Sequence, residues 1–309
     1  MRKTCLDTVY ELAKEDKKVI FIGSDLGPGV LNDFKKNIPE RFFMEGVSEQ
    51  SIIGLSAGLA MEGFKPYVNT IATFITRRCF EQVAIDLCMH NLPVKLLGNG
   101  GGLVYAPLGP THQAIEDISI MRTLPNMTII APCDAIEMKK LVKQTLNYKS
   151  PVYIRIARGG DKIVTSVSEN IKLGKGIIKK EPYEHLFITT GVMTQIAIEA
   201  SERLDKENKI KCGVIHMGTI KPLDKEILLE WIPKVKRVVT VEENLLAGGF
   251  GSSILEFTND HFPEQSHKIS RIGLKDKFVE KYGNQDSLLK DNNLTVENLV
   301  REITNKNKK

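Results

Sequence analysis

The stretch PYVNTIATFITRRCFEQVAIDLCMHNLPVKLLGN, residues 66–99, contains the pattern on which the fold prediction rests. Two short strand-like runs, at 66–70 and 93–99, enclose a helical pattern over 74–90. The runs are nearly continuous in apolar residues rather than alternating, which is typical of parallel strands covered on both faces. A strand, a helix and a second parallel strand form the repeating unit of doubly wound α/β folds.

The same alternation of strands and helices covers most of the chain. Before about residue 160, further strands are predicted at 18–24, 127–132 and 151–157, and further helices at the amphipathic N-terminus, 50–62, 111–123 and 135–146. A Lys/Ser/Glu-rich stretch follows, after which strands are predicted at 185–191, 211–217, 237–244 and 267–273, and helices at 194–204, 224–231, 251–259 and 295–303. We therefore expect an α/β protein with two doubly wound domains: a first domain at 1–163, a linker at 164–183 and a second, smaller domain at 184–309.

The composition is that of a globular protein able to bury a core. Of the 309 residues, 42% are hydrophobic, and 43 Lys and Arg against 38 Asp and Glu give a net charge of +5. No basic run is interleaved with aromatic residues, so we expect no nucleic-acid binding. The five cysteines are scattered without a C-x-x-C pair, which argues against a disulfide framework or a cysteine zinc site. With no signal-peptide core and no apolar run of about 18 residues, we expect a soluble protein of the cytoplasm without a membrane partner.

Glu49 is the first candidate for a chemical role. It follows Ser48, a residue type favoured at N-caps, at the head of the helix predicted over 50–62. That helix is apolar on all sides, so we expect it to be buried. A carboxylate at its head is either a surface acid that stabilises the helix dipole or a group held in an apolar interior, with a raised pKa and a proton-handling role.

A second candidate is His112 in the sequence GPTHQ, residues 109–113. The Gly-Pro pair ends a loop and Thr111 can cap, so His112 is predicted at a helix N-terminus beyond the carboxyl end of strand 93–99. Parallel sheets form their ligand crevices at that edge, and a helix dipole there favours neutral imidazole. A structural loop histidine is the alternative.

Two glycine-rich turns invite a phosphate-binding interpretation. GNGGGL at 98–103 lacks the dinucleotide fingerprint G-x-G-x-x-G, because Leu103 stands where the last glycine is required. AGGFGSS at 247–253 is either an anion cradle at a helix N-terminus or a tight packing turn.

Taken together and in this order, the motifs resemble the C-terminal half of the transketolase family of thiamine-diphosphate enzymes, including the 1-deoxyxylulose-5-phosphate synthases. The resemblance covers almost the whole chain. Its motifs are SDLGPGV (24–30), GVSEQ (46–50), TFITRRCFEQV (73–83), GPTHQ (109–113), LPNMTIIAPCD (124–134), IKPLDKE (220–226), TVEENLLAGGFGS (240–252) and RIGLKDKF (271–278). It implies a transketolase-like pyrimidine-binding domain followed by a transketolase C-terminal domain.

The resemblance implies a cofactor role for Glu49. In this family the corresponding glutamate contacts N1′ of the aminopyrimidine ring of thiamine diphosphate. A hydrogen bond there favours the imino tautomer, whose 4′-nitrogen removes the C2 proton of the thiazolium.

Further cofactor-binding residues follow from the same resemblance. Phe74 matches the aromatic residue that stacks on the pyrimidine, and Ile71 stands in that pocket in place of an aromatic. Arg77 matches an arginine typical of the synthases, and Asp25 and Leu26 match a pair beside the cofactor.

The substrate side matches the family only in part. His112 matches a histidine that shuttles a proton to the reacting oxygen, and Arg158 matches a phosphate-binding arginine. Leu108 replaces an aspartate that reads donor hydroxyls, while Gly100 and Gly29 replace a phosphate-binding histidine and serine. These departures weaken the case for the usual sugar phosphates and favour a specialised sugar substrate.

The family's motif for the diphosphate and Mg²⁺, G-D-G…N, is absent from these 309 residues. The resemblance therefore implies a split transketolase, in which an N-terminal transketolase subunit holds Mg²⁺ and the diphosphate. We expect this chain to form the homodimer core of an α₂β₂ complex that transfers a two-carbon ketol or related acyl unit to an aldehyde.

Two alternatives remain open on the sequence alone. The β subunit of a 2-oxoacid dehydrogenase E1 component shares both domains but passes its acyl group to a lipoyl domain. A non-catalytic α/β regulatory subunit that keeps the fold is the second alternative.

Overall fold

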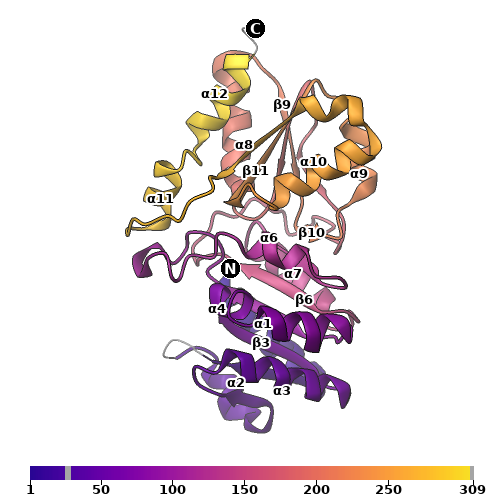
Figure 1. Ribbon diagram of the computed structural model, residues 1–309, viewed down its shortest axis with the longest axis vertical. Coiled ribbons are helices and arrows are strands. Elements are labelled where there is room, and N and C mark those ends of the chain that lie inside the picture. Colours follow the sequence, from indigo (N-terminus) through magenta and orange to yellow (C-terminus); the bar gives the residue numbers. More distant parts are fainter. Residues whose placement is uncertain (25–28, 307–309) are drawn as a thin grey trace. The chain divides into compact units, whose positions relative to one another are not determined.

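The computed structural model describes residues 1–24 and 29–306 (Figure 1). It divides into two compact units. Unit 1 contains Met1–Gly101 and Ile120–Leu173, and unit 2 contains Gly102–Ser119 and Gly174–Lys309. Each unit is an α/β structure with its own sheet, so the predicted fold class is confirmed.

Unit 1 is built on a parallel sheet whose strands follow the order β5-β6-β4-β3-β1-β2. The strands are β1 (Val19–Gly23), β2 (Phe42–Met44), β3 (Lys65–Ile71), β4 (Lys95–Asn99), β5 (Thr128–Ile130) and β6 (Val152–Ile156). All but β2 were predicted from their apolar runs. The edge strand β2 escaped prediction because its three apolar residues are flanked directly by Arg41 and Glu45, so no longer apolar run marks it.

Helices cover both faces of this sheet. They are α1 (Arg2–Glu15), α2 (Asn32–Asn37), α3 (Glu49–Met61), α4 (Ala72–Thr76), α5 (Phe80–Gln82), a π-helical segment (Val83–Met89) and α7 (Ala135–Thr145). The Oη of Tyr67 lies 3.0 Å from Oγ1 of Thr145, which places α7 on one face of β3. Thr70 lies three positions after Tyr67 on β3. Because side chains alternate between the faces of a strand, Thr70 points to the opposite face, where α3 packs.

The prediction of one continuous helix over 74–90 was wrong. The chain leaves the helix after α4, makes a turn at 77–79 and resumes at α5. The Sγ of Cys79 lies 3.1 Å from the carbonyl oxygen of Phe74 and Oγ1 of Thr76 donates to that of Ala72 at 2.7 Å, so side chains at the end of α4 and in the turn contact backbone acceptors of α4.

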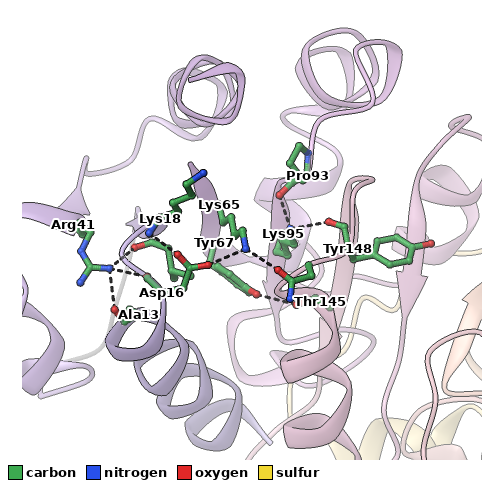
Figure 2. Close-up of polar contacts among 12 residues, drawn as sticks. Ala13, Asp16, Lys18, Arg41, Lys65, Tyr67, Pro93, Lys95, Thr145 and Tyr148 are labelled. Carbon is green, nitrogen blue, oxygen red and sulfur yellow. Dashed lines mark hydrogen bonds and ion pairs between the residues drawn. The ribbon is translucent and has the colours of Figure 1, made fainter. Parts of the chain in front are cut away.

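A polar cluster lies at the amino-terminal edge of this sheet (Figure 2). Lys65 Nζ, at the start of β3, is 2.8 Å from a carboxylate oxygen of Asp16. Arg41 Nη1 donates to the carbonyls of Ala13 at 2.9 Å and Asp16 at 3.0 Å. Lys95, at the start of β4, is fully buried. Ligands of parallel α/β sheets bind at the opposite, carboxyl-terminal edge, so we assign this cluster a structural role.

Unit 2 has a second sheet with the order β12-β11-β8-β9-β7, parallel except for β7. Its strands are β7 (Ile177–Lys180), β8 (His185–Thr189), β9 (Cys212–His216), β11 (Arg237–Leu245) and β12 (Ile269–Leu274), and the short β10 (Thr219–Lys221) follows β9. Its helices are α8 (Met193–Arg203), α9 (Lys225–Trp231), α10 (Phe250–His261), α11 (Gln285–Asp291) and α12 (Val296–Lys306). The edge strand β7 falls within 164–183, which the sequence pattern predicted to be linker.

The segment 102–119 groups with unit 2 although it lies between two parts of unit 1. Leu103, Ala106 and Ile115 are buried in the hydrophobic core of unit 2. The helix predicted over 111–123 is shorter, since α6 spans Asp117–Arg122. Within the described part of the chain, no helix combines the length and apolarity that crossing a bilayer requires.

Candidate cofactor-binding site

Glu49 is the first residue of α3 and is 3% exposed, which confirms its predicted place at the head of the helix and rules out a freely solvated surface acid. Ser48 precedes the helix as expected, but its hydroxyl donates to the carbonyl of Glu45 at 2.7 Å and accepts no N–H of the helix. The helix itself is buried on one side only. Gly54, Leu55 and Met61 are exposed, so the prediction that it is covered on all sides was wrong for this chain by itself.

The carboxylate of Glu49 lies at the carboxyl-terminal edge of the sheet. Ser24, directly after β1, has its Oγ 3.3 Å from Oε1 of Glu49 and 2.6 Å from Oγ1 of Thr70 near the end of β3. Two strand ends and a helix N-terminus thus converge on one acidic group. This is the edge at which doubly wound folds bind ligands.

Arg78 makes the shorter of the two described side-chain contacts with Glu49. Its Nη1 lies 2.7 Å from Oε2 of Glu49, and its guanidinium carbon is 4.1 Å from the centroid of the Phe74 ring. The surroundings of Glu49 are therefore polar and charged, not the apolar interior that the sequence suggested as one alternative. Sequence reasoning missed Arg78; the i, i+4 spacing from Phe74 is a signal that could have found it.

The other predicted cofactor residues are placed as follows. Ile71 ends β3 and precedes α4, and Phe74 is half-buried within α4, so both belong to the chain segment that leads to Arg78. Arg77 is exposed at the end of α4, and its predicted role stays a prediction. Asp25 and Leu26 lie outside the described residues.

His112 does not stand at a helix N-terminus as predicted. It lies in a turn five residues before α6, with its Nδ1 2.9 Å from Oγ1 of Thr111 and its backbone N–H donating to the carbonyl of Gly109. The dipole of α6 therefore does not act on the imidazole as expected, because that effect falls off within the first turn of a helix. Its proton-shuttling role stays a prediction.

The residues expected near the substrate lie on loops. Arg158 is exposed just after β6, and Leu108 is exposed at the end of a short 3₁₀ turn (Ala106–Leu108). Gly100 and Gly29 both have positive φ, 77° and 76°, a conformation that L side chains rarely adopt. Their backbone conformation gives a structural reason for glycine at these two positions.

The glycine-rich turn at 247–253 is a packing turn. The two carboxylate oxygens of Glu242, a fully buried residue of β11, accept the N–H groups of Phe250 at 2.6 Å and Gly251 at 2.8 Å. These donors belong to the first turn of α10. Since the protein's own carboxylate fills the helix N-terminus, the anion-cradle alternative is wrong.

Comparison with known proteins shows that the chain belongs to the transketolase family. Residues 1–160 match the family model described as "Transketolase, pyrimidine binding domain", and residues 174–299 match "Transketolase, C-terminal domain". Enzymes of this family depend on thiamine diphosphate and include transferases and the 1-deoxyxylulose-5-phosphate synthases.

Individual relatives are of two kinds. The chain is 38% identical over 299 residues to the 1-deoxy-D-xylulose-5-phosphate synthase of Clostridium perfringens (strain SM101 / Type A), covering 96% of the chain but 48% of the synthase. It is 35% identical over 305 residues to one subunit of the apulose-4-phosphate transketolase of Phocaeicola vulgatus, covering 97% of the chain and 95% of that protein. Among solved structures, a split-gene transketolase described as an inactive β4 tetramer has a TM-score of 0.89 and 34% identity, covering 98% of this chain and 97% of that one.

Proposed function

We propose that this chain is the C-terminal-half subunit of a split, thiamine-diphosphate-dependent transketolase-like enzyme in sugar metabolism. It would transfer a two-carbon ketol or related acyl unit to an aldehyde acceptor. The proposal rests on the buried carboxylate of Glu49. The planar guanidinium of Arg78 donates to this carboxylate and also lies over the ring of Phe74.

The chemistry of this pair fits an aminopyrimidine. A carboxyl group that can share a proton with a ring nitrogen, beside a half-buried aromatic ring, offers the hydrogen bond and the stacking surface that such a ring needs. When bound, thiamine diphosphate supplies a nucleophilic carbon that can carry the transferred fragment. Glu49 would hold the pyrimidine nitrogen, and Ser24 and Thr70 would keep its carboxylate in place.

Substrate handling is proposed for two loop residues. His112 would move a proton to or from the reacting oxygen, and Arg158 would contact a phosphate of the substrate. The family's hydroxyl reader and two of its phosphate ligands are replaced by Leu108, Gly100 and Gly29. We therefore propose a specialised sugar substrate over the common ketose phosphates.

A second kind of subunit is part of the proposal. The chain spans about half the length of the synthases it matches but almost the whole of a relative that is named as a single subunit of a transketolase. We propose that an N-terminal transketolase subunit in the cytoplasm supplies the site for the diphosphate and Mg²⁺, and that two copies of each chain form the enzyme.

Self-association through α3 would supply the core of that assembly. The helix leaves Leu55 41% and Met61 57% exposed, and the adjacent π-helical segment leaves Ile85 41% and Met89 63% exposed. Exposed apolar side chains on helices that pack against each other are candidates for a protein–protein interface. The relative with the β4 tetramer associates through copies of one chain, which supports a second copy as the occupant.

Reconstitution tests the proposal. The chain is mixed with an N-terminal subunit carrying G-D-G…N, and ketol transfer to an aldehyde is followed with and without thiamine diphosphate. We expect cofactor-dependent activity that falls at least about 100-fold in Glu49→Gln, because the amide is a weak substitute for the carboxylate at the pyrimidine nitrogen. The matched control is Glu40→Gln, whose side chain is 69% exposed and should leave the rate unchanged.

Other outcomes separate the alternatives. Lipoamide-dependent oxidation without ketol transfer would identify a 2-oxoacid dehydrogenase β subunit. Full activity in Glu49→Gln would mean that this chain is a scaffold and that the catalytic assignment of Glu49 is wrong.

A further inference from the structure

Arg78 occupies both recognition elements of the proposed aminopyrimidine site. The same guanidinium that hydrogen-bonds Glu49 at 2.7 Å lies over the ring of Phe74 at 4.1 Å. An aminopyrimidine held by this carboxylate and stacked on this ring would use the same two contacts. A guanidinium is planar, donates N–H groups in its plane and stacks on aromatic faces, so it imitates an aminopyrimidine whose ring nitrogen carries the proton shared with Glu49.

We propose that Arg78 is an internal placeholder for the aminopyrimidine, and that cofactor binding requires its guanidinium to leave Glu49 and Phe74. This inference rests on the proposed function and adds a residue to the cofactor site that sequence resemblance did not assign. Two planar groups cannot stack on the same face of Phe74 while bonding the same carboxylate oxygen. Arg78 therefore competes with the cofactor inside the site.

The Glu49 carboxylate needs a cationic partner while no cofactor is bound. Glu49 is 3% exposed, and the distance from its other carboxylate oxygen to Ser24 Oγ is long at 3.3 Å. A buried carboxylate without a cation is costly, and the charge-assisted bond from Arg78 offsets that cost before the cofactor arrives. With the cofactor bound, Glu49 would make its hydrogen bond to the pyrimidine nitrogen instead of to Arg78.

The position of Arg78 in the chain allows the exchange. It lies in the turn at 77–79 between α4 and α5, so no helix backbone fixes it. Its side chain is 42% exposed, which means that the guanidinium can move into water without crossing the core. Glu49 and Phe74 are held on helices and stay in place.

The energetic consequence is a reduced apparent affinity. The cofactor can bind only the state in which Arg78 has left Glu49 and Phe74. Its apparent dissociation constant therefore equals the intrinsic one divided by the fraction of molecules in that state. A partly exposed Arg–Glu pair reinforced by stacking should therefore weaken aminopyrimidine binding about fivefold. Replacing Arg78 with a residue that cannot make these contacts should therefore tighten aminopyrimidine binding about fivefold.

The test measures binding rather than turnover. Dissociation constants for thiamine and for 4-amino-5-hydroxymethyl-2-methylpyrimidine are determined by ligand-observed NMR with the full chain, for the wild type, Arg78→Met and Arg78→Lys. These probes carry no phosphate, so a contact between Arg78 and a phosphate cannot contribute to the measured dissociation constants. Arg203→Met is the matched control, since Arg203 is 38% exposed and paired with Glu207 at 2.9 Å in unit 2.

We expect both probes to bind about fivefold more tightly to Arg78→Met and by a smaller factor to Arg78→Lys, which keeps the charge but loses the planar stack. Should Arg78→Met fail to fold, Arg78→Lys decides. Unchanged or weaker binding in the Arg78 variants overturns the placeholder while leaving the proposed function intact. Absence of binding in every variant, together with a reconstituted complex that does not take up thiamine diphosphate, contradicts the proposed function itself.

Discussion

Lys95 carries its amine into the fully buried interior of unit 1, where Nζ donates to the carbonyls of Pro93 at 2.6 Å and Tyr148 at 3.2 Å (Figure 2). Its Nζ also lies 5.9 Å from the centroid of the Tyr67 ring. Burial, followed by the positive charge of Lys65, lowers the pKa of Lys95 from 10.5 to about 7. Lys95 therefore titrates near neutral pH, unlike a lysine on the surface.

The lowered pKa predicts a specific pH dependence of stability. Between about pH 7 and 10.5 the unfolded chain binds more protons at Lys95 than the folded chain, so this group makes the free energy of unfolding rise with pH. From pH 7.5 to 9 the gain is roughly 2 kcal/mol. Urea unfolding of the wild type and Lys95→Met at both pH values should show this difference only in the wild type. An equal pH response in the two proteins would contradict the prediction.

Helix α3 has one buried and one exposed face. Ile52, Ile53 and Ala57 pack into unit 1 and fix the position of Glu49, while Leu55 and Met61 face outward. The small residues at 54 and 58 leave the outer face flat, which favours close approach by another helix. The apolar composition that predicted a buried helix is consistent with burial that is completed by a second copy.

Self-association is testable with one substitution. Leu55→Glu places a charge in the proposed interface and should convert an oligomer to a monomer, because desolvating an unpaired carboxylate costs several kcal/mol. Light scattering with size-exclusion chromatography gives the mass. Leu229→Glu is the control, since Leu229 is 42% exposed on α9 and lies outside the proposed interface. If both variants keep the wild-type mass, α3 is not the interface.

At the scale of the whole molecule, segment 102–119 is part of unit 2, although in the sequence it lies between the two parts of unit 1. Glu243 on β11 is 2% exposed and accepts the N–H of Leu103 at 2.8 Å and the amide of Gln285 at 2.9 Å. Further along, the N–H of Leu245 donates to the carbonyl of Ile115 at 2.7 Å. These contacts anchor the segment that carries His112.

Removal of the anchor should loosen this segment selectively. Glu243→Ala leaves buried donors of Leu103 and Gln285 without an acceptor, at a cost of about 1–3 kcal/mol. Hydrogen exchange followed by mass spectrometry should show faster exchange in 102–119 and unchanged exchange in β1 and β3. Glu230→Ala, a 53% exposed residue, serves as control. Uniform acceleration across both units would argue against a local anchor.

Local sequence determined much of this protein. Apolar runs and helical periodicity predicted the central strands of both sheets and the place of Glu49 at a helix start, because these depend on neighbours within a few residues. The family motifs extended that prediction to a thiamine-diphosphate enzyme. The edge strands β2 and β7 were not predicted, because charged residues interrupt or directly flank their apolar residues.

Tertiary structure alone decided the rest. The pairing of Arg78 with Glu49 and the grouping of 102–119 with unit 2 join residues far apart in the chain. The filling of the α10 N-terminus by Glu242 depends on how strand β11 and helix α10 pack. Buried carboxylates require charged or N–H partners, and only the folded chain determines which partner is within reach.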